Sequence, residues 1–260
     1  MDTLTSLLQA TIGTEQARQL VLFLVFLPLF FFTYWAVKRG LTISLRPIPS
    51  YAALQRLLSQ AAETGKPVHL SLGTAGVADQ FTADTMAGLT TLEYLADRAT
   101  VSASPPIVTV ANPTALPVAQ DVLRRAYIRH GYPEEYDPAR ARMIAPDGIA
   151  YAAGAMQMLN HQKLTANVML GRFGDEFLLL GETGAQRNLQ QVGGTSAERV
   201  LPLVHAAVEH PLIGEEMYAG GAYLLKKPGH LASLFAQDLM RWLIVVAIVV
   251  AIALKSLGVV

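Results

Sequence analysis

Apolar positions divide the chain into two long apolar runs with a mixed segment between them. Residues 19–37 (QLVLFLVFLPLFFFTYWAV) carry no charge, and at about 1.5 Å per residue they just cross a bilayer core of about 30 Å. The second run, WLIVVAIVVAIAL at 242–254, extends backwards as a continuous helical pattern through HLASLFAQDLMR. We therefore predict transmembrane helices at 19–37 and 231–260. The alternatives are a cleaved signal peptide for the first run and a buried helix of a soluble protein for the second.

Between the two runs, short apolar stretches alternate with amphipathic ones. VHLSLG, PPIVTVAN and ARMIAP read as strands, and each is followed by a helical pattern with a capping residue near its start: Thr82, Asn112 or Asp147. ANVMLG and EFLLLGE read as two more strands around GRFGD. Strand–turn–helix units in succession favour parallel pairing with helices on the faces. The predicted fold class is α/β, a mostly parallel Rossmann-like sheet with covering helices, flanked by one N-terminal and one C-terminal transmembrane helix.

The same pattern divides the chain into segments. We expect an outer tail at 1–18, a span at 19–37, an α/β domain at 45–210, a glycine-rich juxtamembrane segment at 211–230 and a C-terminal span at 231–260. The tail carries Leu4, Leu7, Leu8 and Ile12 at helical spacing, which fits either a short amphipathic helix or a frayed tail.

Basic residues gather between the two apolar runs, 19–37 and 242–254, where Lys38, Arg39, Arg46, Lys226, Lys227 and Arg241 lie. Cytoplasmic segments of membrane proteins carry this excess of Lys and Arg. We therefore expect the chain in the plasma (inner) membrane, with the α/β domain facing the cytoplasm and both termini outside.

Composition narrows the functions. The formal net charge of the 260 residues is zero, which argues against nucleic-acid binding. The chain has no cysteine, so disulfides, thiolate zinc sites and a cysteine nucleophile are excluded. No H-E-x-x-H or G-x-S-x-G motif occurs. We predict no metal site, no cofactor and no catalytic residue; the sequence favours a non-enzymatic role without settling the point.

Polar and glycine residues follow the predicted strands, at the edge where open α/β sheets bind ligands. The candidate ligand-binding residues are Gly73, Thr74, Gly76, Asn112, Thr114 and Asp147. The turn supplies G-x-x-G and not the dinucleotide fingerprint G-x-G-x-x-G, and no Walker A loop is present. These residues therefore either form a ligand site or simply shape tight turns and cap helices.

Two carboxylates, Glu215 and Glu216, lie in an otherwise apolar, glycine-rich run. Unpaired acids there are costly, so we expect them to cap a helix N-terminus or to pair with Arg172, Arg187 or Arg199. The run could also lie on the membrane surface or form a contact between protomers. The candidate interface residues are Glu215, Glu216, Tyr218, Gly220, Gly221 and Tyr223.

Two motifs carry a resemblance. A G-x-F-G-x-E turn spans 171–176, and IGEEMYAGGAYL precedes the C-terminal span. This pattern resembles an uncharacterised family of membrane-anchored bacterial proteins, a domain of unknown function. The resemblance covers most of residues 45–255, supports the architecture and implies no activity or site residues.

Two functional hypotheses follow. In the first, the chain is a membrane-anchored, non-enzymatic α/β domain acting as a structural or assembly subunit of a homo-oligomer or a larger membrane complex. Its partners are then the lipid bilayer and itself or another membrane protein, with no nucleic acid. In the second, it is a small-molecule or nucleotide-binding Rossmann-like domain with its site at the strand-end turns. The first predicts that the polar turn groups serve as caps, and the second predicts a polar pocket there.

Overall fold

The computed structural model describes residues 14–101 and 104–256. The chain forms two compact units, which are described separately: one is Arg46–Leu225, and the other combines the residues on either side of it. Residues 1–13 of the expected outer tail lie outside the described residues, and the first helix begins at Thr14.

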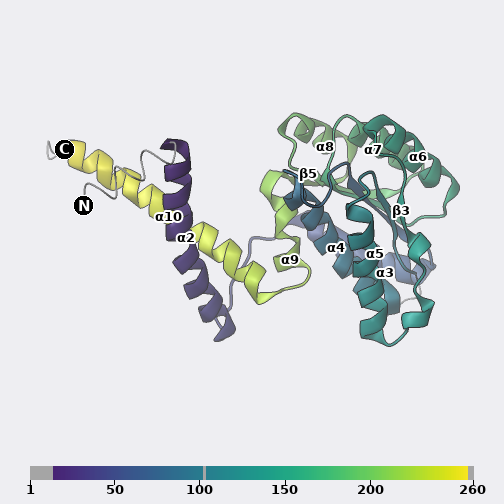
Figure 1. The fold of residues 1–260 in the computed structure, drawn as a ribbon, viewed down its shortest axis with the longest axis horizontal. Helices are drawn as coiled ribbons and strands as arrows, with labels where there is room; N and C mark the ends of the chain where they lie inside the picture. The colour runs from purple at the N-terminus through teal and green to yellow at the C-terminus, as the bar shows by residue number, and fades with distance from the viewer. Residues whose placement is uncertain (1–13, 102–103, 257–260) are drawn as a thin grey trace. The chain divides into compact units, whose positions relative to one another are not determined.

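A six-stranded sheet forms the centre of the unit Arg46–Leu225 (Figure 1), and all its strands are parallel. The strands are β1 Val68–Gly73, β2 Ile107–Val110, β3 Ala141–Met143, β4 Ala166–Arg172, β5 Gln190–Thr195 and β6 His210–Ile213. Strands β1 and β2 are buried along their whole length, as strands covered on both faces must be. The predicted α/β class with a parallel sheet is confirmed.

The strand order β3-β2-β1-β4-β5-β6 makes the sheet doubly wound. Helices α3 Pro49–Thr64, α4 Thr82–Val101 and α5 Ala115–His130 lie on one face (Figure 1). Helix α6 Gly148–His161 carries the chain from edge strand β3 to central β4, and α7 Glu176–Gln186 and α8 Leu201–Ala207 follow on the other face. The direction of winding therefore reverses between β1 and β4. Short 3-10 helices complete the unit: η1 Pro133–Glu135, η2 Pro138–Arg140, η3 Glu198–Val200 and η4 Gly214–Ala219.

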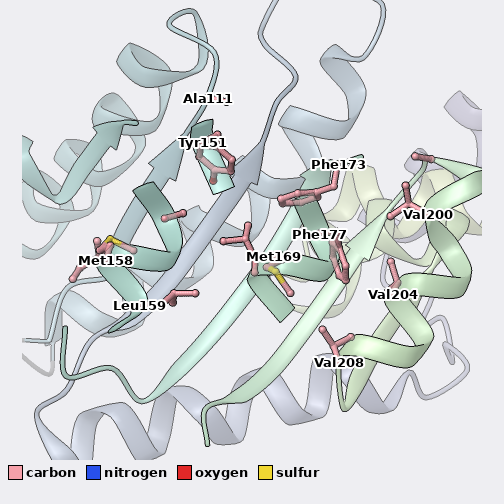
Figure 2. Packing of buried hydrophobic residues seen from close by; sticks show 14 of the residues in the cluster. Ala111, Tyr151, Met158, Leu159, Met169, Phe173, Phe177, Val200, Val204 and Val208 are labelled. Carbon is pink, nitrogen blue, oxygen red and sulfur yellow. The ribbon is translucent and has the colours of Figure 1, made fainter. Parts of the chain in front are cut away.

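The main apolar cluster lies between the sheet and the face that carries α6, α7 and α8 (Figure 2). Phe173 and Phe177 pack edge to face, with ring centroids 5.4 Å apart, a favoured aromatic geometry. Tyr151 of α6 and Met169 of β4 are fully buried beside them. This packing fixes the N-terminal ends of α6 and α7 against the end of β4.

The predicted strand EFLLLGE is wrong, because these residues begin helix α7. An apolar run of this length fits a strand and a buried helix equally well. The helix buries Phe177, Leu180, Gly181 and Gly184 at helical spacing and leaves Leu178 and Leu179 exposed.

The sequence reading also missed β5, whose sequence QQVGGT has low strand propensity. Its glycines are required by close packing. A Cβ on Gly193 would lie 2.6 Å from the Phe177 ring, and one on Gly194 would lie 2.8 Å from Leu212 Cβ.

The glycine-rich run after β5 belongs to the compact α/β unit as far as Leu225. Strand β6 pairs with β5, and η4 and α9 Gly220–Tyr223 follow. Tyr51 of α3 donates a hydrogen bond to the Glu216 carbonyl at 2.7 Å and stacks on Tyr223, with ring centroids 5.2 Å apart.

The second unit contains the two apolar helices, α2 Thr14–Lys38 and α10 Pro228–Ser256. Within them, Gln19–Lys38 and Pro228–Ser256 are long and apolar enough to cross a membrane. The two helices contact each other, and the buried hydroxyl of Thr33 donates to the carbonyls of Phe30 at 2.9 Å and Ala232 at 3.2 Å. Both predicted spans therefore coincide with apolar helices at the expected places in the chain.

Candidate functional site

An open cavity of about 430 Å³ lies at the carboxyl ends of the central strands, where the winding reverses. Ligands of open α/β sheets bind at this position. The lining residues come from the ends of β1 and β4, from the starts of α6 and α7 and from the segment after β5: Thr74, Pro146, Gly148, Arg172, Phe173, Gly174, Glu176, Ala197, Glu198 and Arg199.

Gly73 brings the ends of β1 and β4 into close contact. Its φ is +74°, and a Cβ there would lie 2.0 Å from the carbonyl oxygen of Arg172. The same carbonyl accepts hydrogen bonds from the amide of Thr74 at 2.8 Å and from its hydroxyl at 3.2 Å. Gly73 therefore serves the close approach of two strands, and Thr74 is held beside the cavity.

The other turn residues singled out from the sequence make hydrogen bonds within the chain. The amide of Val77 donates to Oγ1 of Thr114 at 2.8 Å, and the Thr114 hydroxyl donates to Oδ1 of Asn112 at 2.8 Å. The amide of Gly76 donates to Asp79 at 2.7 Å. Asp147 accepts from the amides of Ile149 and Ala150, so its predicted role as the N-cap of α6 is confirmed. Of the six predicted ligand residues, Thr74 lines the cavity.

Acidic side chains of the chain itself occupy the helix N-termini around the cavity. Asp84 lies in the first turn of α4 and is 2% exposed. Asp147 caps α6, and Glu176 is the first residue of α7. A helix N-terminus favours negative charge, and here that charge is supplied internally. These N-termini are therefore poorly suited to cradle a phosphate, in contrast to those of nucleotide-binding loops.

Glu176 presents a carboxylate oxygen at the cavity wall. The residue is 8% exposed, and its Oε1 accepts a hydrogen bond from the Gly174 amide at 2.7 Å. Among the residues that the structure describes, none bonds to Oε2. Cβ atoms on Gly148 and Gly174 would lie 3.3 and 2.8 Å from this oxygen. The two glycines therefore allow the backbone to approach this oxygen closely.

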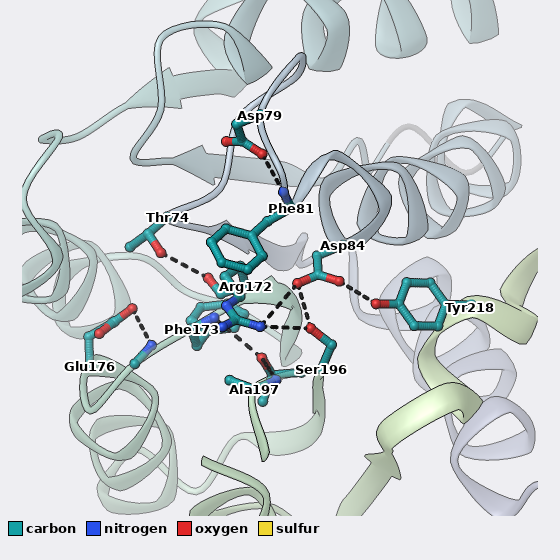
Figure 3. A network of polar contacts seen from close by, with 12 residues as sticks. Thr74, Asp79, Phe81, Asp84, Arg172, Phe173, Glu176, Ser196, Ala197 and Tyr218 are labelled. Carbon is teal, nitrogen blue, oxygen red and sulfur yellow. Dashed lines mark hydrogen bonds and ion pairs between the residues drawn. The ribbon is translucent and has the colours of Figure 1, made fainter. Parts of the chain in front are cut away.

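Arg172 lines the same cavity, and Figure 3 shows its side chain beside Phe81, Asp84 and Ser196. The guanidinium lies 4.0 Å from the centre of the Phe81 ring, a cation–π contact. Its Nη1 donates to Oγ of Ser196 at 3.0 Å and lies 3.8 Å from Oδ2 of Asp84. Ser196 in turn donates to Asp84 at 2.6 Å. These contacts fix the guanidinium and leave Nε and Nη2 without an acceptor in the part of the chain that is described.

Of the six predicted interface residues, Gly220 and Gly221 are buried in their own unit, and Glu215 and Tyr218 are exposed. The hydroxyl of Tyr223 donates to the carbonyl of Arg46. Glu216 meets Arg46 at 2.6 Å and accepts from the amide of Ile213, whereas Glu215 is exposed. The expectation that an acid here caps a helix start and meets a basic partner holds for Glu216. The partners named for it, Arg172, Arg187 and Arg199, were wrong.

A buried row of polar side chains crosses the middle of the sheet. His69 of β1 hydrogen bonds to Asn167 of β4 at 2.8 Å and to Thr109 of β2 at 2.9 Å, and Asn167 donates to Gln191 of β5 at 2.9 Å. Burial lowers the pKa of His69 to about 4, although its hydrogen bond with Asn167 acts in the opposite direction. The sequence signal was a polar residue at the second position of each of β1, β4 and β5.

The row lies near the N-terminal ends of β1, β4 and β5, away from the carboxyl ends that line the cavity. It is fully hydrogen-bonded, so it stabilises the sheet rather than forming a ligand site. Within the described residues, no group of His, Asp and Glu side chains could hold a metal ion.

Comparison with known proteins adds one finding. No curated protein and no solved structure matches the chain. A family model described as a domain of unknown function, DUF6754, matches residues 9–260. Because the match extends over nearly all of the sequence, the chain belongs to the DUF6754 family.

Proposed function

We propose that this chain is a membrane-anchored α/β domain that binds a small polar molecule in the cavity at the switch point. One observation carries the proposal: a carboxylate oxygen of the buried Glu176 faces the cavity without a hydrogen-bond partner among the described residues. This oxygen is not among the buried unpaired side-chain atoms of the described residues, so it is accessible from the cavity and can accept a hydrogen bond from a ligand. The site uses Glu176 and Arg172 in place of the glycine turn that the sequence suggested.

The two apolar helices support a membrane location. We propose the plasma (inner) membrane, with the α/β domain in the cytoplasm and both termini outside, because basic residues flank the domain on the segment between the helices. In this arrangement the cavity is open to solutes of the cytoplasm.

Native mass spectrometry of the full-length protein, released gently from membranes, tests the binding proposal. The expected result is a bound species of small mass that is retained by wild type and by Glu182→Gln, a variant of an exposed acid on α7. Glu176→Gln should lose it. A protein that retains no small molecule, and that no metabolite extract stabilises against thermal unfolding, would contradict the proposal.

A second candidate function is assembly, in which the domain is a structural subunit of a homo-oligomer or a larger membrane complex. Exposed apolar side chains on adjoining helices favour it: Ile149 at the start of α6 is 75% exposed, and Leu178 and Leu179 on α7 are 42% and 43% exposed. The capping of α6 by Asp147 agrees with it as well. The mass of the detergent-solubilised particle tests it: a multiple of 28.0 kDa that Ile149→Ser disrupts supports assembly, and a clean monomer contradicts it.

A further inference from the structure

We propose that the ligand of the switch-point cavity is a zwitterion of amino-acid type, with its ammonium group at Glu176 and its carboxylate at Arg172. This inference rests on the proposed function and names the chemical class of the ligand. The Glu176 carboxylate and the Arg172 guanidinium each have hydrogen-bonding atoms that no group of the described chain satisfies.

The acceptor side is the free oxygen of Glu176. The residue is 8% exposed, and its other oxygen already accepts a bond from Gly174. Burying a carboxylate is costly unless it is paired and hydrogen-bonded. A cationic N–H donor completes this pairing better than a neutral one, because charge-assisted hydrogen bonds are about twice as strong. The backbone of Gly148 and Gly174 lies close to Oε2 on one side, so an ammonium group would reach this oxygen from the open side of the cavity.

The donor side is the guanidinium of Arg172, which Phe81, Ser196 and Asp84 hold in place. Guanidinium presents donors in a fixed planar fork that matches a carboxylate, and Nε and Nη2 of Arg172 bond to no acceptor among the described residues. At the rim, Arg199 is exposed and adds a second cation. A ligand carboxylate therefore finds its counter-charge on the side of the cavity formed by β4 and the segment after β5.

Phosphate ligands fit this site less well. The N-termini of α4, α6 and α7 already have Asp84, Asp147 and Glu176 as their negative partners. A phosphate would bring further negative charge next to Glu176 and Glu198, which both line the cavity. Because both acidic and basic side chains line the cavity, a ligand that carries one positive and one negative charge fits it better.

The size of the cavity agrees with a small ligand. Its volume of about 430 Å³ lies at the lower end of the range of about 300–1,000 Å³ typical of ligand pockets. An amino acid fits into this space with room for its side chain.

Binding of each of the twenty standard L-amino acids to the full-length protein in detergent tests the proposal by equilibrium dialysis. For whichever binds best, two matched probes are added, one without the amino group and one without the carboxylate; inorganic phosphate is a further probe. We expect at least one amino acid to bind, and each truncated probe to bind about 10- to 100-fold more weakly, the range expected for a lost charge-assisted hydrogen bond.

Two variants of different kinds locate the site. Glu176→Gln removes the charge and should weaken amino-acid binding at least about 10-fold. Gly148→Ala keeps every charge but places a methyl group about 3.3 Å from Oε2, and it should also weaken binding. Glu182→Gln is the matched control and should bind as wild type does. Hydrogen exchange of the strands verifies that each variant is folded.

The outcomes separate the two proposals. If no amino acid binds, or if the truncated probes bind as well as the intact one, the zwitterion is ruled out. If phosphate or another small molecule binds instead and Glu176→Gln abolishes that binding, the cavity is still a ligand site and only its proposed class is wrong. If nothing binds, both proposals fail.

Discussion

The hydroxyl of Tyr218 donates a hydrogen bond to Oδ1 of Asp84, and this contact joins η4 to the first turn of α4 (Figure 3). The other oxygen of the same carboxylate accepts from Ser196, which accepts from Arg172 at the cavity. A continuous chain of hydrogen bonds therefore links the cavity to the segment that precedes α10 in the sequence. Burial and the hydrogen bond to Asp84 both raise the pKa of Tyr218, so the phenol remains a donor at neutral pH.

Tyr218→Phe removes one donor from the buried carboxylate of Asp84. We expect the free energy of unfolding of the α/β unit to fall by about 1.5–3 kcal/mol, as for other hydrogen bonds to charged groups. Hydrogen exchange should show the loss in α4 and η4. Tyr132→Phe, at a tyrosine that is 49% exposed, should change neither. Equal protection in both variants would mean that the Tyr218 contact contributes nothing to stability.

Gly73→Ala tests the close approach of β1 and β4. Gly73 has φ +74° and no space for a Cβ, whereas Gly65 has φ +66° and nothing within 4 Å of the position that a Cβ would take. Gly65→Ala therefore costs only the left-handed backbone strain of about 1–2 kcal/mol. Gly73→Ala adds a backbone clash and should cost more than about 3 kcal/mol. Thermal unfolding of the two variants side by side measures the difference; similar losses would contradict the geometry at Gly73.

The strands that could be predicted from the sequence include those that are buried along their whole length. Val68–Gly73 and Ile107–Val110 are continuously buried and apolar enough to be predicted. Strand β5 was missed because Gly193 and Gly194 are chosen for contact with Phe177 and Leu212, which are distant in the sequence.

Contacts between residues that are distant in the sequence also determine the candidate site. The strand-end location could be predicted, but the residues that matter there could not. Arg172 and Asp84 are brought together by the sheet and have no local signature. Glu176 lay in a segment read as a turn between strands, and only the helical start of α7 places its carboxylate beside Gly148.

The buried row at His69 predicts a pH dependence of stability. The pKa of His69 is lowered from 6.5 to about 4 in the folded chain, so between these values the unfolded chain binds more protons. The contribution of His69 to the free energy of unfolding is therefore fully present above about pH 6.5 and is lost as the pH is lowered towards 4. The loss over this window is on the order of 3 kcal/mol.

Hydrogen exchange of the β1 and β4 amides at pH 7 and pH 4.5, corrected for intrinsic exchange rates, measures this loss. His69→Gln should be less stable at pH 7 and should lose most of the pH dependence. His161→Gln, at an exposed position on α6, should retain it. A wild-type protein with constant stability across the window would contradict the role assigned to His69.

The orientation in the membrane gives the last prediction. Because the chain has no cysteine, single cysteines can be labelled without further changes. Ser256→Cys lies at the end of α10, and Ser59→Cys lies at an exposed position on α3. If the α/β domain faces the cytoplasm as proposed, a membrane-impermeant maleimide should label spheroplasts of a bacterial expression host that carry Ser256→Cys but not those that carry Ser59→Cys. Lysis should expose both. Labelling of Ser59→Cys in intact cells would place the cavity outside, where its ligand could not be a cytoplasmic solute.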